Sequence, residues 1–91
     1  MPKKVKTSAM PDLSQKLTPE LLGEAIRARR TQSALKLEDA AALCGVAKQT
    51  LTDIEGGKAN SQINTILQIC NGLGIKLYIQ SWHTGNGAED E

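Results

Sequence analysis

Apolar residues recur at helical spacing in four successive stretches of the chain, and the first stretch starts after Thr18. Thr18 followed by Pro19 favours a helix start, because threonine can cap free amides and a proline at the first helical position has no amide to leave unpaired. Acidic residues lie near this start and arginines near the end, as the helix dipole favours. The pattern predicts a helix that begins near Pro19 and ends between Thr31 and Ala34.

Two shorter apolar stretches follow. The segment LEDAAALC begins near two acidic residues and meets Gly45, which can stop a helix because glycine readily adopts the left-handed conformation. The next stretch runs from about Ala47 to Glu55, places Leu51 and Ile54 on one face, and ends at a pair of glycines. The sequence therefore predicts two short helices joined by a tight turn.

The fourth stretch has the most regular helical period, and the pattern changes after it. Asn60 and Ser61 can cap its start, and Asn71-Gly72 or Gly74 can end it. The inward positions predicted for this helix are Ile63, Ile66, Leu67, Cys70 and Leu73. From Ile75 to Trp82 apolar and polar residues alternate, which predicts a β-strand without an obvious partner.

Composition favours one small helical domain. The chain has 91 residues with 2% aromatics and no phenylalanine, so its core must use leucine, isoleucine and alanine, which suit helices. We expect a folded domain over 17–82, a flexible basic tail over 1–16 and a flexible acidic tail over 83–91. Cys44 and Cys70 are too few for a disulfide scaffold, so we expect them reduced and buried, in a cytoplasmic protein.

Charge and motif content exclude several classes of protein. The 11 basic and 10 acidic residues leave a net charge of +1. The chain contains no secretory signal and no run of about 18 apolar residues, so we expect neither secretion nor membrane insertion. It also contains no nucleophile beside a base, no paired carboxylates and no glycine-rich phosphate loop. We therefore expect no enzyme activity, no cofactor and no metal site.

The two short helices carry the features that a helix-turn-helix requires. Ala41 is small enough for the helices to cross closely, Gly45 supplies the turn, and Leu51 and Ile54 fix the second helix to the body of the domain. The outer face of that second helix is then free to read DNA.

The segment LEDAAALCGVAKQTLTDIEGGKANSQINTILQICNGLGI resembles the helix-turn-helix domain of the Xre family, which includes phage Cro and repressor proteins. The form that ends in a strand instead of a fifth helix resembles the DNA-binding antitoxins of the HipB kind, over about Leu21 to Ile79. This resemblance implies a mainly α, four- to five-helix, lambda-repressor-like domain whose C-terminal strand pairs across a dimer.

Two positions depart from the family pattern. The family usually has Thr-Gln where this chain has Lys36-Leu37, so a glutamine that helps to clamp a phosphate is missing, and Lys36 is expected to replace it by charge. The family commonly has glycine where this chain has Ala34. Either the first helix ends differently, or Ala34 carries strain of about 1 kcal/mol.

The resemblance also implies which residues face DNA. The recognition helix would present Lys48, Gln49, Thr52 and Asp53 to bases, with guanine, adenine, the thymine methyl group and cytosine as their respective partners. The residues implied as phosphate contacts are Lys36, Thr50, Lys58, Asn60, Ser61, Gln62, Arg27 and Arg30. For the two arginines, compensation of the helix dipole, or an ion pair between Arg30 and Glu55, explains the charges equally well.

A homodimer is expected, because one helix-turn-helix reads only part of a groove and two copies can bind half-sites about one helical turn apart. The lone strand offers an interface, since pairing with the same strand of a second copy satisfies its amides and carbonyls. The residues expected at this interface are Leu77, Tyr78, Ile79 and Trp82. The alternative is that the strand pairs within the chain, with residues 4–8.

The resemblance implies a sequence-specific regulator that binds a palindromic double-stranded operator. As an antitoxin it would repress its own operon and bind a co-encoded toxin of the HipA-like kinase type. A plain repressor remains open, and the alternative from another class is an adaptor or inhibitor that uses the same fold with little DNA binding.

Overall fold

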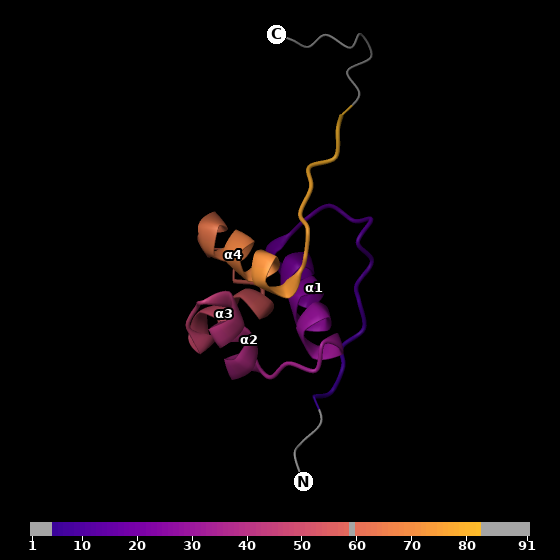
Figure 1. Cartoon of the computed structure of the whole chain (residues 1–91). Coiled ribbons are helices and arrows are strands. Elements are labelled where there is room, and N and C mark those ends of the chain that lie inside the picture. Colours follow the sequence, from indigo (N-terminus) through magenta and orange to yellow (C-terminus); the bar gives the residue numbers. More distant parts are fainter. Residues whose placement is uncertain (1–4, 59, 83–91) are drawn as a thin grey trace.

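Four helices follow one another in the computed structural model, which describes residues 5–58 and 60–82. They are α1 (Pro19–Gln32), α2 (Leu37–Cys44), α3 (Lys48–Glu55) and α4 (Ile63–Leu73). Figure 1 shows α2, α3 and α4 gathered against one side of α1, the longest of the four. The described residues thus form an all-α fold, and the predicted order and approximate bounds of the four helices are confirmed.

The ends of α1 follow from local chemistry. The Thr18 hydroxyl accepts a hydrogen bond from the Leu21 amide at 3.0 Å, and Pro19 occupies the first turn, as predicted. At the other end Ala34 adopts a φ of 60°. The sequence left open whether α1 ends differently from the family pattern or Ala34 is strained. The second alternative is correct: α1 ends as a helix with glycine at this position would, and Ala34 carries the strain.

All four helices of the described residues close with the same pair of backbone hydrogen bonds, the Schellman motif. In each, the residue that follows the positive-φ position (Ala34, Gly45, Gly57 or Gly74) donates its amide to a carbonyl five residues earlier, at distances from 2.8 to 3.1 Å. At three ends this residue is apolar and packs half-buried against the core: Leu35, Val46 and Ile75. After α3 it is Lys58, whose side chain stays exposed.

The core lies where the four helices meet. Its fully buried large side chains are Ile26, Leu51, Ile69 and Cys70. The face predicted for α4 is partly wrong, because Ile63 and Leu67 remain 64% and 47% exposed while Ile69 is buried. The buried stripe is rotated relative to the predicted one, since α4 lies at the edge of the bundle and only one flank of its wide apolar face meets other helices.

The start of α4 also differs from the prediction. Gln62, and neither Asn60 nor Ser61, is the residue at the N-cap, and its side chain caps no amide. Ser61 instead donates its hydroxyl to the Lys58 carbonyl at 3.4 Å. This hydrogen bond lies within the loop that joins α3 to α4, and the first amides of α4 have no side-chain cap.

Gly23 and Gly72 allow the closest helix crossings, although Gly72 was predicted only as a possible end of the fourth helix, which in fact ends at Gly74. A Cβ atom added to Gly23 would lie 2.6 Å from the carbonyl oxygens of both Ile54 and Glu55, and one added to Gly72 would lie 2.6 Å from the Cys44 sulfur. Gly23 therefore lets α1 rest directly on the backbone of α3. Gly72 lets α4 approach α2 in the same way.

Residues 75–82 form no strand in this chain, so the predicted strand is not seen in the described structure. Figure 1 shows the segment running away from the helices. A strand needs a neighbour for its backbone groups, and the proposed internal partner is engaged elsewhere: Ser8 donates its amide to Thr31 Oγ1 at 2.9 Å and accepts from Gln32 Nε2 at 2.8 Å. The internal pairing is therefore wrong for residues 5–8.

Parts of the predicted tails lie outside the described residues, namely 1–4 and 83–91. Residues 5–17 lie outside the helices, and Ser8 holds this segment against the end of α1. No helix among the described residues is long and apolar enough to cross a bilayer.

Candidate nucleic-acid interface

Helix α3 has one face fixed to the protein and one face open to solvent. Leu51 and Ile54 are 0% and 3% exposed, and both belong to the core cluster that α3 shares with the other helices. Lys48, Gln49 and Thr52 are exposed, and Asp53 is half-buried at the border of the two faces. The inward aliphatic residues thus set the rotation of the helix, and that rotation exposes three of the predicted base-contacting side chains to solvent and leaves Asp53 at the border.

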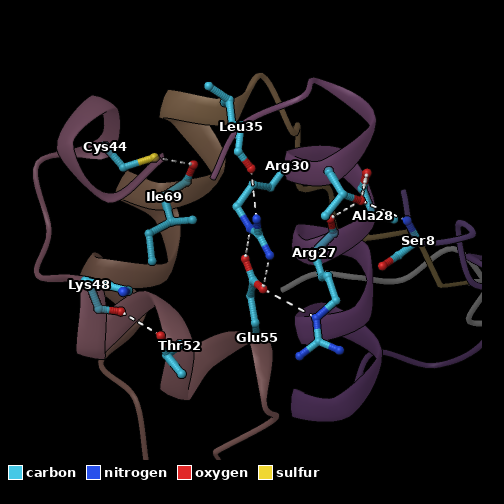
Figure 2. A network of polar contacts seen from close by, with 11 residues as sticks. Ser8, Arg27, Ala28, Arg30, Leu35, Cys44, Lys48, Thr52, Glu55 and Ile69 are labelled. Carbon is cyan, nitrogen blue, oxygen red and sulfur yellow. Dashed lines mark hydrogen bonds and ion pairs between the residues drawn. The ribbon is translucent and has the colours of Figure 1, made fainter. Parts of the chain in front are cut away.

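The last residue of α3, Glu55, is tied to α1 by a buried ion pair. Arg30 donates from Nε to Glu55 Oε2 at 2.6 Å and from a terminal nitrogen to Oε1 at 3.0 Å, and its other terminal nitrogen donates to the Leu35 carbonyl at 2.8 Å. Figure 2 shows the guanidinium held between these two partners. Arg27 adds a longer contact to Glu55 Oε1 at 3.4 Å. The C-terminal end of α3 is therefore anchored at several points.

This geometry corrects the role of Arg30. The residue is 8% exposed, and both edges of its guanidinium donate within the protein. A group so engaged cannot reach a phosphate, and the alternative that paired Arg30 with Glu55 is confirmed. Arg27, whose side chain is 52% exposed, still reaches solvent.

The starts of α2 and α3 each carry an exposed lysine. Lys36 occupies the N-cap of α2 and is exposed, as is Lys48 at the start of α3. The pKa of Glu38 is lowered, first by a hydrogen bond from its own backbone amide and then by the positive charges of Lys48 and, more weakly, Lys36. The Glu38 carboxylate therefore experiences the positive charge of a predicted base contact, Lys48, and of a predicted phosphate contact, Lys36.

A polar hollow of about 230 Å³ separates α3 from the start of α4. Its lining residues are Thr50, Asp53, Lys58, Asn60, Ser61, Gln62 and Thr65. Five of these are predicted phosphate contacts, so the fold brings that part of the set together. Thr65 was missed, although its place in the first turn of α4 is the signal that would have found it. The uncapped amides of α4 and the Lys58 ammonium make this α3–α4 hollow suitable for an anion.

Three polar side chains at the outer edge of α3 are linked. Gln49 donates from Nε2 to Asp53 Oδ1 at 2.8 Å, and Lys58 Nζ lies 3.6 Å from the same oxygen. Thr52 donates its hydroxyl to the Lys48 carbonyl at 2.9 Å. The methyl group of Thr52 is then the part of this side chain that is free to make other contacts. All of these residues were predicted to face DNA, but none of these contacts between them was predicted.

The sequence profile of the family described as "Helix-turn-helix domain" matches residues 21–77, a span that takes in α2, α3, α4 and nearly all of α1. The chain belongs to this helix-turn-helix family. A curated relative, the uncharacterized HTH-type transcriptional regulator y4mF of Sinorhizobium fredii, is 32% identical to this helix-turn-helix chain over 62 residues, which are 68% of this chain and 82% of that protein.

Solved structures share the fold of this helix-turn-helix chain at low sequence identity. A complex of a HipB variant with an O2 20mer has a TM-score of 0.69 at 18% identity, and covers 77% of this chain and 97% of that one. The HipB–O4 20mer complex has a TM-score of 0.67 at 19% identity, with 74% and 94% covered. The hypothetical transcription factor NHTF from Neisseria has a TM-score of 0.65 at 22% identity, with 80% and 83% covered.

The cysteines of the helix-turn-helix domain are buried, as predicted. Cys44 and Cys70 are 5% and 2% exposed. Burial raises the pKa of both thiols, and for Cys70 burial together with the neighbouring Cys44 raises it to about 11. Thiols with such pKa values stay protonated near neutral pH, so they pack as small apolar groups and are poor nucleophiles.

Proposed function

We propose that this helix-turn-helix protein is a sequence-specific DNA-binding transcriptional regulator. The observation that carries the proposal is the division of α3 into a fixed face and an open face. Leu51 and Ile54 hold the helix from within, and Glu55 anchors its end, so the outward side chains are presented from a rigid support. A helix held in this way can enter the major groove without losing the order that base recognition requires.

The proposed base contacts are Lys48, Gln49 and Thr52, which share the open face. Glutamine can pair with adenine through two hydrogen bonds, and lysine can donate to guanine. The Thr52 hydroxyl hydrogen is directed at the Lys48 carbonyl, so its methyl group is suited to contact a thymine methyl.

The proposed phosphate contacts lie on both sides of α3. Lys36 stands at the start of α2, and Lys58, Asn60, Ser61, Gln62 and Thr50 line the α3–α4 hollow. Two sets of contacts to DNA phosphates, one on each side of the recognition helix, would fix the register of that helix in the groove, since phosphate contacts position a protein without reading sequence. Arg27, exposed beside Glu55, is a further proposed contact at the edge of this surface.

We also propose that the regulator acts as a homodimer on a palindromic operator. Beyond Ile75, whose amide closes α4, residues 76–82 make no backbone hydrogen bond to the described part of the chain, and Tyr78, Ile79 and Trp82 are 83%, 89% and 78% exposed. Large apolar side chains at such exposure favour burial against a partner. Pairing of this segment with the same segment of a second copy would form the strand that a single chain lacks, with Leu77 and the outer face of α4 beside it.

The finer proposal is an autorepressing antitoxin that binds a co-encoded toxin of the HipA-like kinase type. Its support is the resemblance to HipB, whose complexes share this fold. The alternative of an adaptor or inhibitor with little DNA binding is favoured by a different observation, the near-neutral net charge of +1. A steep loss of DNA affinity as salt rises would support the regulator, because phosphate neutralisation releases counterions.

A duplex selection followed by a matched pair of variants tests the proposal. The wild-type protein should enrich a palindromic site from a random duplex pool, and Gln49→Ala should weaken binding to that site by about 1–3 kcal/mol while leaving random duplexes unaffected. Gln15→Ala, which removes an exposed glutamine outside the helices, is the control and should change neither. Equal losses on every duplex would remove Gln49 from the base contacts, and no enriched site would favour the adaptor.

A further inference from the structure

The Asp53 carboxylate joins a predicted base contact to a predicted phosphate contact. Its Oδ1 atom accepts from Gln49 Nε2 at 2.8 Å and lies 3.6 Å from Lys58 Nζ. Gln49 and Asp53 are one helical turn apart on α3, whereas Lys58 is the residue whose amide closes that helix onto the Asp53 carbonyl. The side chain and the backbone of Asp53 thus both take part in placing its neighbours.

The contact with Asp53 limits what Gln49 can offer to a base. A glutamine amide has two N–H donors and one carbonyl acceptor. With one N–H directed at the carboxylate, one donor and the acceptor remain, which is the pair that the major-groove edge of adenine requires. Guanine presents two acceptors on that edge and therefore needs both N–H groups. The opposite orientation of the Gln49 amide would place its carbonyl oxygen next to the carboxylate. That orientation is unfavourable, because both groups are negatively polarised.

We propose that Asp53 is a specificity-determining positioning residue: it orients the Gln49 amide for adenine against guanine, and it holds Lys58 over the α3–α4 hollow. This inference rests on the proposed function and changes one part of it, because it replaces the predicted contact between Asp53 and cytosine. The Asp53 side chain is 31% exposed, and its Oδ1 already accepts from Gln49 and forms an ion pair with Lys58, whereas the Gln49 side chain is exposed on the open face.

The position of the carboxylate has a second consequence. A negative charge at the edge of a DNA-binding face repels phosphates and lowers affinity for every duplex. Removal of the charge should therefore raise overall affinity, and removal of the acceptor oxygen should lower discrimination. The two effects are separable, because asparagine keeps a carbonyl oxygen at this position without the charge.

The test compares Asp53→Asn and Asp53→Ala in the full chain, on the duplex that the wild-type protein selects and on the same duplex with adenine replaced by guanine at the Gln49 position. Gln49→Ala identifies that position. Asp53→Ala should reduce the preference for adenine by about tenfold, whereas Asp53→Asn should keep it within about twofold. Both should bind random duplexes about two- to fivefold more tightly. Glu24→Gln removes an equal charge from an exposed site on α1 and should change neither quantity.

A double variant separates positioning from direct contact. In the Gln49→Ala background, Asp53→Ala should alter base preference no further, because there is no amide left to orient. The inference is overturned if Asp53→Ala relaxes the preference at a cytosine instead, if that change persists without Gln49, or if the adenine preference survives Asp53→Ala. Circular dichroism of each variant establishes that it is folded, and the asparagine variant tests the charge effect independently. Failure of the proposed function gives a different result, since the wild-type protein would then select no site.

Discussion

Helix α3 carries two acidic residues in different surroundings: Glu55 faces α1, and Asp53 lies at the border of the open face. Glu55 is 6% exposed and binds Arg30 through both carboxylate oxygens, inside the junction with α1. Asp53 lies at the rim, where one oxygen serves Gln49 and Lys58. A buried pair cannot lose one partner without leaving a charge in a poorly solvated site, whereas water can replace either partner of an exposed one. The first cluster therefore supports the fold, and the second is free to serve recognition.

The largest expected effect breaks the buried cluster. Glu55→Ala leaves the Arg30 guanidinium buried with only the Leu35 carbonyl as an acceptor, so it should lower the free energy of unfolding by about 3–5 kcal/mol. Asp53→Ala, the matched removal at the rim, should lower it by less than about 1 kcal/mol. Urea denaturation followed by circular dichroism measures both. Equal losses would mean that burial does not distinguish the two clusters.

The next prediction tests the backbone contact beneath the buried cluster. Gly23→Ala places a methyl group 2.6 Å from two carbonyl oxygens of α3, so α1 must move away and the loss in unfolding free energy should be about 1–3 kcal/mol. Gly56→Ala is the control, because the added methyl group would lie 3.4 Å from its nearest neighbour, the Thr52 carbonyl oxygen, and the φ of Gly56 is −80°. The control should be neutral or stabilising by up to about 1 kcal/mol. Thermal unfolding that ranked the two variants in the opposite order would contradict the proposed close crossing.

The smallest expected effect concerns two helix ends that support the fold and lie outside the open face of α3. Ala34→Gly should stabilise the protein by up to about 1 kcal/mol, because glycine adopts the observed φ of 60° without strain. Gly45→Ala, at a φ of 74° in the same kind of helix end, should destabilise it by about 1 kcal/mol. Neither variant touches the open face, so base preference should stay unchanged. Thermal unfolding and duplex binding check the two halves of this prediction, and a destabilised Ala34→Gly variant would show that the strain is absent.

The sequence predicted those features of the fold that depend on near neighbours. Thr18, Pro19 and Gly45 act within a few residues along the chain, so their roles in starting and stopping helices follow from local chemistry. The roles of Gly23 and Gly72 in helix packing could not be assigned in this way, because they arise where two helices distant in sequence cross. Ile69 was missed for a related reason: a broad apolar stripe does not reveal which of its flanks meets other helices.

The candidate interface was predictable to a similar extent. The outward positions of Lys48, Gln49 and Thr52 follow once Leu51 and Ile54 are placed inward, and the exposures agree with that placement. The spacing of four between Gln49 and Asp53 was available as a signal for a side-chain contact. The ion pair between Lys58 and Asp53 could not be predicted, because it depends on how the chain turns after α3.

The segment 75–82 marks a limit of a different kind. Its alternating pattern predicts a strand, but hydrogen bonds between strands need a second strand, and the described part of this chain provides none. A pattern of this kind therefore indicates a tendency to pair and leaves the partner unspecified.

The most direct test of the central claim is a nuclear magnetic resonance titration of isotopically labelled protein with the selected duplex. The open face of α3 should respond specifically: the side-chain amide of Gln49 and the backbone amides of Lys48 and Thr52 should shift with the selected duplex and far less with a scrambled one, while Leu51 and Ile54 stay buried. If the sequence-specific shifts fall instead on residues 75–82, with α3 unaffected, the recognition surface lies elsewhere and the account is wrong.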